Sequence, residues 1–287
     1  MTNPSILQHL PHCVDSAFLG FKQFQDEQYD LKIKQDHRLN EQDIALFQGT
    51  NLLSKVARSV CLSKTIRLKE LLESIEFFLR VRKHLKAPKV KDICCGHGLV
   101  GLLFAIFEEH IQEVELIDIK FNPSQKRLLN ALTEIAPWLN DKVKCTESKL
   151  SDLIDQLKHT QSSENSLENS NSDHSDLAIF SVHACGQQSD LTLKLAQIYQ
   201  AKVAIMPCCY PPKIRKSYDF LKDQLGVILT LDIQRSQDLQ DLGYQVQWLE
   251  IPSKITPMNR IIVAQPKQSI DSLSQSSLVS SQPSLIG

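Results

Sequence analysis

The sequence is poor in glycine and aromatic residues, and it contains no long apolar run. Nine of its 287 residues are glycine, and 6% are aromatic. The longest apolar run, residues 99–107, is far shorter than the roughly 20 residues that span a bilayer. The chain does not open with a basic segment followed by an apolar one, as a secretory signal does. We therefore expect a cytoplasmic protein without a membrane segment, with reduced cysteines.

The chain also has almost no net charge, but its charges are unevenly distributed. The formal net charge is −1. Residues 55–89 carry ten Lys or Arg and three acidic residues, whereas residues 1–50 carry four and seven. Such a local excess of positive charge attracts a polyanion, or it forms the solvated face of helices. In the first case, we expect the basic residues Arg80, Arg82 and Lys83 to contribute to the polyanion-binding surface.

Hydrophobic periodicity divides the chain into three regions. Residues 1–87 are expected to form helices, because apolar side chains recur at helical spacing until Pro88. Short apolar runs alternate with helical segments through residues 88–266, with a polar insert at 159–175. The remaining residues, 267–287, are rich in Ser, Gln and Pro, and we expect them to form a disordered tail.

The alternation of strands and helices predicts an α/β fold. Parallel strands are expected at 90–95, 114–120, 142–148, 176–186 and 201–210, with a closing antiparallel pair at 244–252 and 259–266. Right-handed crossovers then give the order 3-2-1-4-5 in the parallel part. The prediction is a seven-stranded Rossmann-like sheet, mostly parallel with the last strand antiparallel, after an N-terminal helical region.

A glycine-rich turn follows the first predicted strand. Three of the nine glycines, Gly96, Gly98 and Gly101, lie in this turn, and glycine allows the backbone to approach a ligand closely. The second strand ends in Asp118, where a carboxylate can accept hydrogen bonds from both hydroxyls of a ribose. These residues predict a nucleoside cofactor at the carboxyl ends of the strands.

Two cofactors are compatible with this turn, and the acidic residue before it favours one of them. The spacing of the glycines satisfies the dinucleotide fingerprint of NAD enzymes. Asp92, however, would repel a pyrophosphate, whereas it suits the positive charge of S-adenosylmethionine. We therefore expect S-adenosylmethionine, with NAD and a cofactor-free fold as alternatives. Glu147, just after the third strand, is a candidate contact to the adenine.

Two more turns carry a distinctive pattern. The fourth strand ends in His183-Ala-Cys185-Gly186, with Asp190 four residues later, and the fifth ends in Cys208-Cys209-Tyr210. Together with DICCGHG at 92–98, these turns resemble a group of Rossmann-fold methyltransferase domains over roughly residues 85–266. That group includes the eukaryotic tRNA acceptor-stem 2′-O-ribose methyltransferase and the glutathione S-transferase C-terminal-domain-containing protein.

The resemblance implies methyl transfer from S-adenosylmethionine. It places Asp92, Gly96, Gly98 and Asp118 at cofactor-binding positions, and His183, Cys185, Gly186 and Asp190 beside the methyl group. Three departures leave the substrate open. Cys94 replaces the usual glycine, the fifth turn continues with Tyr-Pro-Pro rather than His, and the zinc-binding segments of the tRNA enzymes are missing before residue 90.

The candidate catalytic residues depend on the atom that is methylated. For a ribose hydroxyl, His183 or Asp190 would act as general base; alternatively, His183 bonds the turn and Asp190 caps the next helix. For a base nitrogen, Tyr210 would stack on the target ring. For pyrimidine C5, the thiolate of Cys208 would add to the ring. The expected substrate-binding residues are Cys208, Cys209, Tyr210, Lys213 and Arg215, the last two through phosphates.

The cysteines and histidines at the strand ends also raise the question of a metal. Zinc prefers tetrahedral Cys and His ligands, commonly supplied as close pairs on loops. Successive residues of a strand point to opposite faces, so the pairs Cys94-Cys95 and Cys208-Cys209 match this preference poorly. We therefore expect no metal.

Three functions remain from these observations. The first is a methyltransferase that acts on RNA, either tRNA or rRNA, with the N-terminal basic helices helping to hold it. The second is a small-molecule methyltransferase of the same fold, and the third is a catalytically silent RNA-binding or scaffold module. Nothing in the sequence indicates an obligate protein partner.

Overall fold

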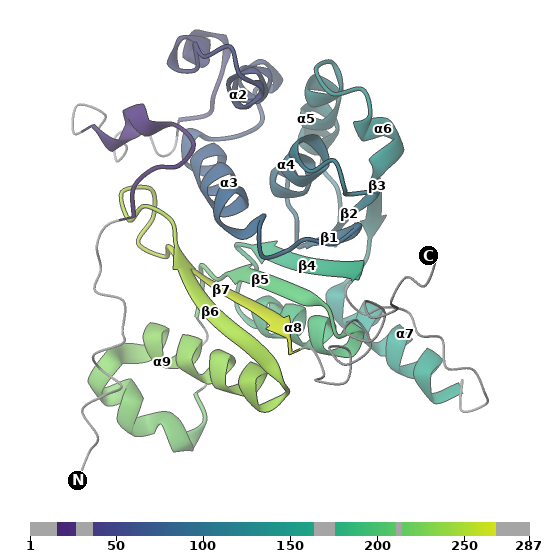
Figure 1. The fold of residues 1–287 in the computed structure, drawn as a ribbon, viewed down its shortest axis with the longest axis vertical. Coiled ribbons are helices and arrows are strands. Elements are labelled where there is room, and N and C mark those ends of the chain that lie inside the picture. Colours follow the sequence, from purple (N-terminus) through teal and green to yellow (C-terminus); the bar gives the residue numbers. More distant parts are fainter. Residues whose placement is uncertain (1–15, 27–36, 164–175, 211–213, 268–287) are drawn as a thin grey trace, which may run out of the picture.

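The computed structural model describes residues 16–26, 37–163, 176–210 and 214–267 (Figure 1). Most of the polar insert at 159–175, and all but Lys267 of the expected disordered tail, lie outside these residues. The α-helices are α2 (Leu52–Ser63), α3 (Leu68–Val81), α4 (Leu99–Phe107), α5 (Pro123–Thr133), α6 (Leu139–Lys142), α7 (Leu150–Ser163), α8 (Gln187–Tyr199) and α9 (Asp219–Asp241). Short 3-10 helices cover Lys22–Gln25, Glu41–Leu46 and Lys216–Tyr218. Across these described ranges, no helix is long and apolar enough to span a bilayer.

One seven-stranded sheet forms the centre of the fold, and it confirms the predicted architecture. Its strands are β1 (Lys89–Ile93), β2 (Glu113–Asp118), β3 (Val143–Glu147), β4 (Leu177–Val182), β5 (Lys202–Met206), β6 (Tyr244–Glu250) and β7 (Arg260–Pro266). Their order is β3-β2-β1-β4-β5-β7-β6. Strands β1 to β5 pair with one another in parallel, and β7 is antiparallel to both β5 and β6. Strands β4 and β5 end earlier than predicted, at Val182 and Met206, so His183, Cys185 and Cys208 lie in the turns that follow them.

Helices cover both faces of the sheet (Figure 1). Helices α2 to α6 lie on one face, and α7, α8 and α9 lie on the other. Two apolar clusters fill the space between the sheet and these layers. The first cluster includes side chains of α2 and α3 as well as β1 and β4. The described part of the N-terminal region therefore shares its hydrophobic core with the sheet.

The longest helix of the described chain, α9, was not predicted. Nine of its 23 residues are apolar, but Gly226, with a φ of 77°, interrupts its helical backbone. Its buried positions include polar and charged side chains, among them Thr230, Asp232 and Arg235. The hydrophobic periodicity that identifies a helix in a sequence is therefore weak over this segment.

A buried ion pair joins the N-terminal segment to α3. Glu76 is 1% exposed, and its carboxylate accepts hydrogen bonds from the backbone N–H groups of Leu19 and Gly20 at 3.0 and 2.8 Å. Arg80 forms an ion pair with Glu76, and it also donates hydrogen bonds to the carbonyls of Ala17 and Glu250. The prediction that Arg80 contributes to an exposed basic surface is wrong, because its side chain is only 9% exposed.

We predict that Arg80→Ala strongly destabilises the protein. The substitution leaves the Glu76 carboxylate buried without its cation, which typically costs about 3–5 kcal/mol of the free energy of unfolding. Urea unfolding followed by circular dichroism measures this loss. Lys83→Ala removes a basic residue that is exposed in the next turn, and it should change stability by less than about 0.5 kcal/mol. Equal effects of the two substitutions would contradict the structural role of Arg80.

Candidate active site

In the turn after β1, several residues adopt left-handed backbone conformations, and the backbone at Gly96 faces open space. Gly96 and Gly98 have φ angles of 56° and 74°, and Cys94 has a φ of 55° although it carries a side chain. A Cβ atom at Gly96 would meet no atom within 4 Å, whereas one at Gly101 would lie 2.4 Å from the Leu116 side chain. Gly101 therefore permits the close packing of α4 on β2, and Gly96 presents its backbone to open space.

Asp118 links the end of β2 to this turn. One of its carboxylate oxygens accepts a hydrogen bond from the Gly96 N–H at 2.8 Å, and the other accepts one from the Ile119 N–H at 2.7 Å. Each carboxylate oxygen can accept more than one hydrogen bond. Asp118 is only half-buried, so it retains the capacity to accept hydrogen bonds from the hydroxyls of a ribose.

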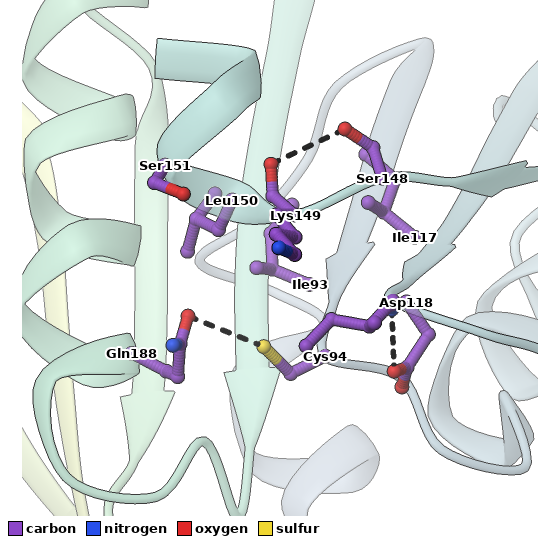
Figure 2. A pocket seen from close by; sticks show the side chains of 10 residues that line it. Ile93, Cys94, Ile117, Asp118, Ser148, Lys149, Leu150, Ser151 and Gln188 are labelled. Carbon is purple, nitrogen blue, oxygen red and sulfur yellow. Dashed lines mark hydrogen bonds between the residues drawn. The ribbon is translucent and has the colours of Figure 1, made fainter. Parts of the chain in front are cut away.

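A pocket lies next to Asp118, at the carboxyl ends of β1 and β2 (Figure 2). It encloses about 100 Å³, so it holds only part of a nucleoside cofactor. Figure 2 shows side chains from three strand ends and the start of α8 directed into it. The lining residues are Ile93, Cys94, Ile117, Asp118, Ile119, Ser148, Lys149, Leu150, Ser151 and Gln188. The mixture of apolar and polar groups suits a purine ring and its ribose.

Glu147, the predicted adenine contact, is the last residue of β3. It is not among the pocket-lining residues, and its carboxylate accepts a hydrogen bond from the Phe121 N–H at 2.9 Å. The residues that follow it, Ser148 to Ser151, run into the start of α7 and line the pocket. The sequence placed the turn correctly, but it contained no signal to distinguish Glu147 from its successors.

Asp92 is a buried carboxyl group beneath the turn. It is 2% exposed, and one of its oxygens accepts a hydrogen bond from the Gly101 N–H at 2.9 Å. Burial raises the pKa of Asp92 to about 8. Ionisation of this group is therefore costly unless a positive charge lies nearby, and it would be costlier still beside a pyrophosphate. This environment fits a cationic cofactor such as S-adenosylmethionine better than NAD.

The turn after β4 contacts Glu73 of α3, a residue that the sequence analysis did not identify. His183 has a φ of 62°, and its N–H donates a hydrogen bond to the Met206 carbonyl at 3.1 Å. Its imidazole Nε2 lies 2.8 Å from a carboxylate oxygen of Glu73. Glu73 belongs to α3 and is 1% exposed. No sequence pattern indicates this pair, because its two members are 110 residues apart.

Asp190 and Tyr210 are brought together by α9. The prediction that Asp190 caps a helix is wrong, because α8 begins at Gln187, before Asp190. Its carboxylate accepts a hydrogen bond from the Nε of buried Arg235 at 2.7 Å. The Arg235 guanidinium lies 5.4 Å from the centroid of the Tyr210 ring, and the Tyr210 hydroxyl donates to Asp232 at 3.1 Å. Burial raises the pKa of Tyr210, so the phenol stays neutral.

Three thiols meet at the ends of β4 and β5. The Sγ atom of Cys208 lies 3.2 Å from that of Cys185 and 3.6 Å from that of Cys209. The expectation that Cys208 and Cys209 point to opposite faces is wrong, because β5 ends at Met206 and strand alternation stops there. Burial, followed by the neighbouring thiols, raises the pKa of Cys208, which disfavours a nucleophilic thiolate.

The structure gives little support to the phosphate contacts expected from the basic residues after the fifth turn. Lys213 lies outside the described residues. Arg215 forms an ion pair with Asp238, and its guanidinium lies 5.1 Å from the centroid of the Tyr218 ring. Arg215 is therefore held by α9 and the short helix before it, rather than by the turn itself.

The buried Asp92 gives a prediction about stability. Its pKa rises from an ordinary 3.8 to about 8, so between these pH values the folded protein retains a proton that the unfolded chain has released. The stability that is present below about pH 4 is then lost as the pH rises towards 8, by at most about 1.4 kcal/mol per pH unit.

Asp92→Asn should flatten this decline, because the amide does not ionise and its oxygen can still accept from the Gly101 N–H. Thermal unfolding at intervals from pH 4 to 8 measures the effect. Asp223→Asn alters an exposed carboxyl group and should keep the wild-type slope. Parallel curves for wild type and Asp92→Asn would contradict the prediction.

Comparisons with known proteins identify the family. Residues 63–215, more than half of the chain, match the family described as a methyltransferase domain. No curated protein matches the sequence. A methyltransferase from Podospora anserina with bound SAH is 14% identical, with 75% of this chain and 88% of that chain covered and a TM-score of 0.42.

Two further structures have similar values. Magnesium protoporphyrin IX methyltransferase from Synechocystis PCC 6803 is 14% identical, with 83% of this chain and 100% of that chain covered and a TM-score of 0.36. A SAM-dependent methyltransferase from Aquifex aeolicus is 18% identical, with coverages of 65% and 87% and a TM-score of 0.35.

These TM-scores lie below 0.5, so the assignment depends on the family match and the geometry of the turns. Both agree with the predicted enzyme class and with the predicted cofactor, S-adenosylmethionine. The chain belongs to the methyltransferase domain family.

Proposed function

We propose that this protein methylates a hydroxyl group of RNA. The observation that carries the proposal is the pair formed by His183 and Glu73 at the carboxyl end of β4. Strand β4 is the parallel neighbour of β1, so the pair lies beside the cofactor turn. A hydroxyl group must lose a proton when it is methylated, and a histidine held by a buried carboxylate can take that proton.

The cofactor determines what remains for the protein to do. S-adenosylmethionine supplies a methyl group that is already activated, so the enzyme has to hold the acceptor in line with it and to remove a proton. Asp118 would hold the ribose of the cofactor, and the residues from Ser148 to Leu150 would line the adenine side. Asp92 would offset the positive charge of the cofactor.

The hydrogen bond to Glu73 determines which nitrogen of His183 acts as the base. A carboxylate oxygen only accepts hydrogen bonds, so Nε2 carries the hydrogen in this pair. In the neutral ring the lone pair is then on Nδ1, which would take the proton of the substrate hydroxyl. The Glu73 carboxylate would stabilise the resulting imidazolium, so Glu73 acts as a positioning residue.

A group of basic residues at the edge of this site supports an RNA substrate. Arg38 and Arg67 lie on adjacent backbone segments joined by an isolated β-bridge, and both are exposed. The pKa of His97, in the cofactor turn, is lowered by burial, and the charge of Arg38 contributes to the lowering. The Nζ atom of Lys69 lies 3.5 Å from the Oε1 atom of Glu73. We propose that Arg38, Arg67 and Lys69 contact phosphates of the RNA.

The resemblance of the three turns to tRNA methyltransferases favours tRNA, and rRNA is the alternative. We propose the cytoplasm as the place of action, where thiols such as those of the described cysteines stay reduced. If a small molecule were the substrate instead, basic side chains outside the pocket would have no effect on catalysis.

One test of the proposed function concerns the removal of the substrate proton. Comparison of RNA nucleosides by mass spectrometry, from cells with and without the gene, identifies the methylated position, and the matching transcript then serves as substrate. His183→Asn should lower kcat about 10²- to 10⁴-fold, and Glu73→Gln should lower it by a smaller factor. The KM for S-adenosylmethionine should stay unchanged in both. A rise in that KM without a fall in kcat would contradict the assigned roles.

Another test of the proposed function concerns the binding of RNA. The double substitution Arg38→Glu and Arg67→Glu should raise the KM for the transcript at least about tenfold and reduce the salt dependence of binding. Lys83→Glu with Lys86→Glu makes the same change of charge before the amino end of β1, opposite the carboxyl ends that form the site, and should leave both values unchanged. Equal effects of the two pairs, or methylation of a small molecule alone, would contradict an RNA substrate.

A further inference from the structure

The three thiols at the ends of β4 and β5 form a cluster to which the proposed proton transfer assigns no role. Cys185 comes from the turn after β4, and Cys208 and Cys209 come from the turn after β5. Their Sγ atoms all lie within 4.8 Å of one another. The parallel pairing of Val182 with Met206, and the hydrogen bond from the His183 N–H to the Met206 carbonyl, hold the two turns side by side.

The spacing of the sulfur atoms matches that of metal ligands. Three sulfur ligands, each about 2.3 Å from a tetrahedral zinc ion, lie about 3.8 Å from one another. The distances of 3.2 and 3.6 Å, with the upper limit of 4.8 Å for the third, bracket this value. A disulfide requires two sulfur atoms about 2.05 Å apart, and it would leave the third thiol without a role.

We propose that Cys185, Cys208 and Cys209 bind one zinc ion through three thiolates. Binding would release the three thiol protons to the solvent, and the fourth coordination position would remain available to a water molecule or a substrate atom. Cys185 and Cys209 are exposed and Cys208 is partly buried, so the ion would face solvent on one side. It would tie the turn that carries His183 to the turn that carries Tyr210.

A metal ion bound by the cluster would affect two side chains of the candidate active site. His183 is two residues before Cys185, and Tyr210 directly follows Cys209. Linking the two turns through one ion would restrict the orientations of both side chains beside the cofactor turn. The proposal is independent of the RNA substrate, because binding of the metal can be measured without any methylation assay.

The test is a titration of the reduced, metal-free, full-length protein with Co²⁺ alone, followed by absorption spectroscopy. A site with three thiolates gives sulfur-to-cobalt charge-transfer bands that saturate at one ion per chain, and these bands should disappear when zinc is added. Native mass spectrometry of the protein purified under reducing conditions should show one zinc ion per chain.

Variants connect the signal to the cluster. Cys208→Ser and Cys185→Ser should each weaken metal binding at least tenfold. Cys145→Ser removes an exposed thiol of β3 and should leave it unchanged. The metal-free variants should unfold at the temperature of the metal-free wild type, so that weaker binding reflects lost ligands. If Cys208→Ser fails to fold, Cys209→Ser takes its place.

Three results would overturn the proposal. The first is the absence of charge-transfer bands in the reduced wild type. The second is full retention of the bands in the folded Cys185→Ser or Cys208→Ser variant. The third is a disulfide between Cys185 and Cys208 in the protein purified from the cytoplasm, shown by peptide mapping, because the two turns would then form a redox pair.

Discussion

The candidate active site depends on the packing of α3 against β4. The Phe180 ring of β4 is stacked on Phe104 of α4, with centroids 4.9 Å apart, and it lies 6.0 Å from Phe77 of α3. Glu73 is one helical turn before Phe77, so both project from the same face of α3. His183 follows Phe180 by three residues. The contact that buries Phe77 on Phe180 therefore also brings the Glu73 carboxylate to the imidazole of His183.

This packing gives the N-terminal region a different role from the one expected of a basic appendage. Helix α3 supplies a buried carboxylate to the site, and Arg80 on the same helix holds the N-terminal segment through Glu76. The RNA contacts that we propose on this helix, Arg67 and Lys69, accordingly lie near the start of α3 rather than near its end. The positive stretch seen in the sequence thus separates into a structural part and a part beside the site.

The sequence predicted the sheet and the turns far better than the contacts within the site. Glycine spacing and strand periodicity are local signals, and they located the glycine-rich turn after β1 and placed Asp118 at the end of β2. Glu73 and Arg235 could not be found in this way, because each meets its partner only through tertiary packing. The convergence of Cys185 with Cys208 was missed for a different reason. To recognise it, the end of β5 would have to be predicted to within two residues. Strand boundaries, however, are the least certain part of a prediction from sequence.

The central claim, that the ends of β1 and β2 bind S-adenosylmethionine, is tested most directly by isothermal titration calorimetry of the purified protein with this cofactor. The wild type should bind one molecule per chain, and Asp118→Asn should bind at least tenfold more weakly. Glu113→Gln, which alters a carboxylate at the opposite end of β2, should bind like the wild type. Absence of binding by the folded wild type, or equal binding by Asp118→Asn, would contradict the claim.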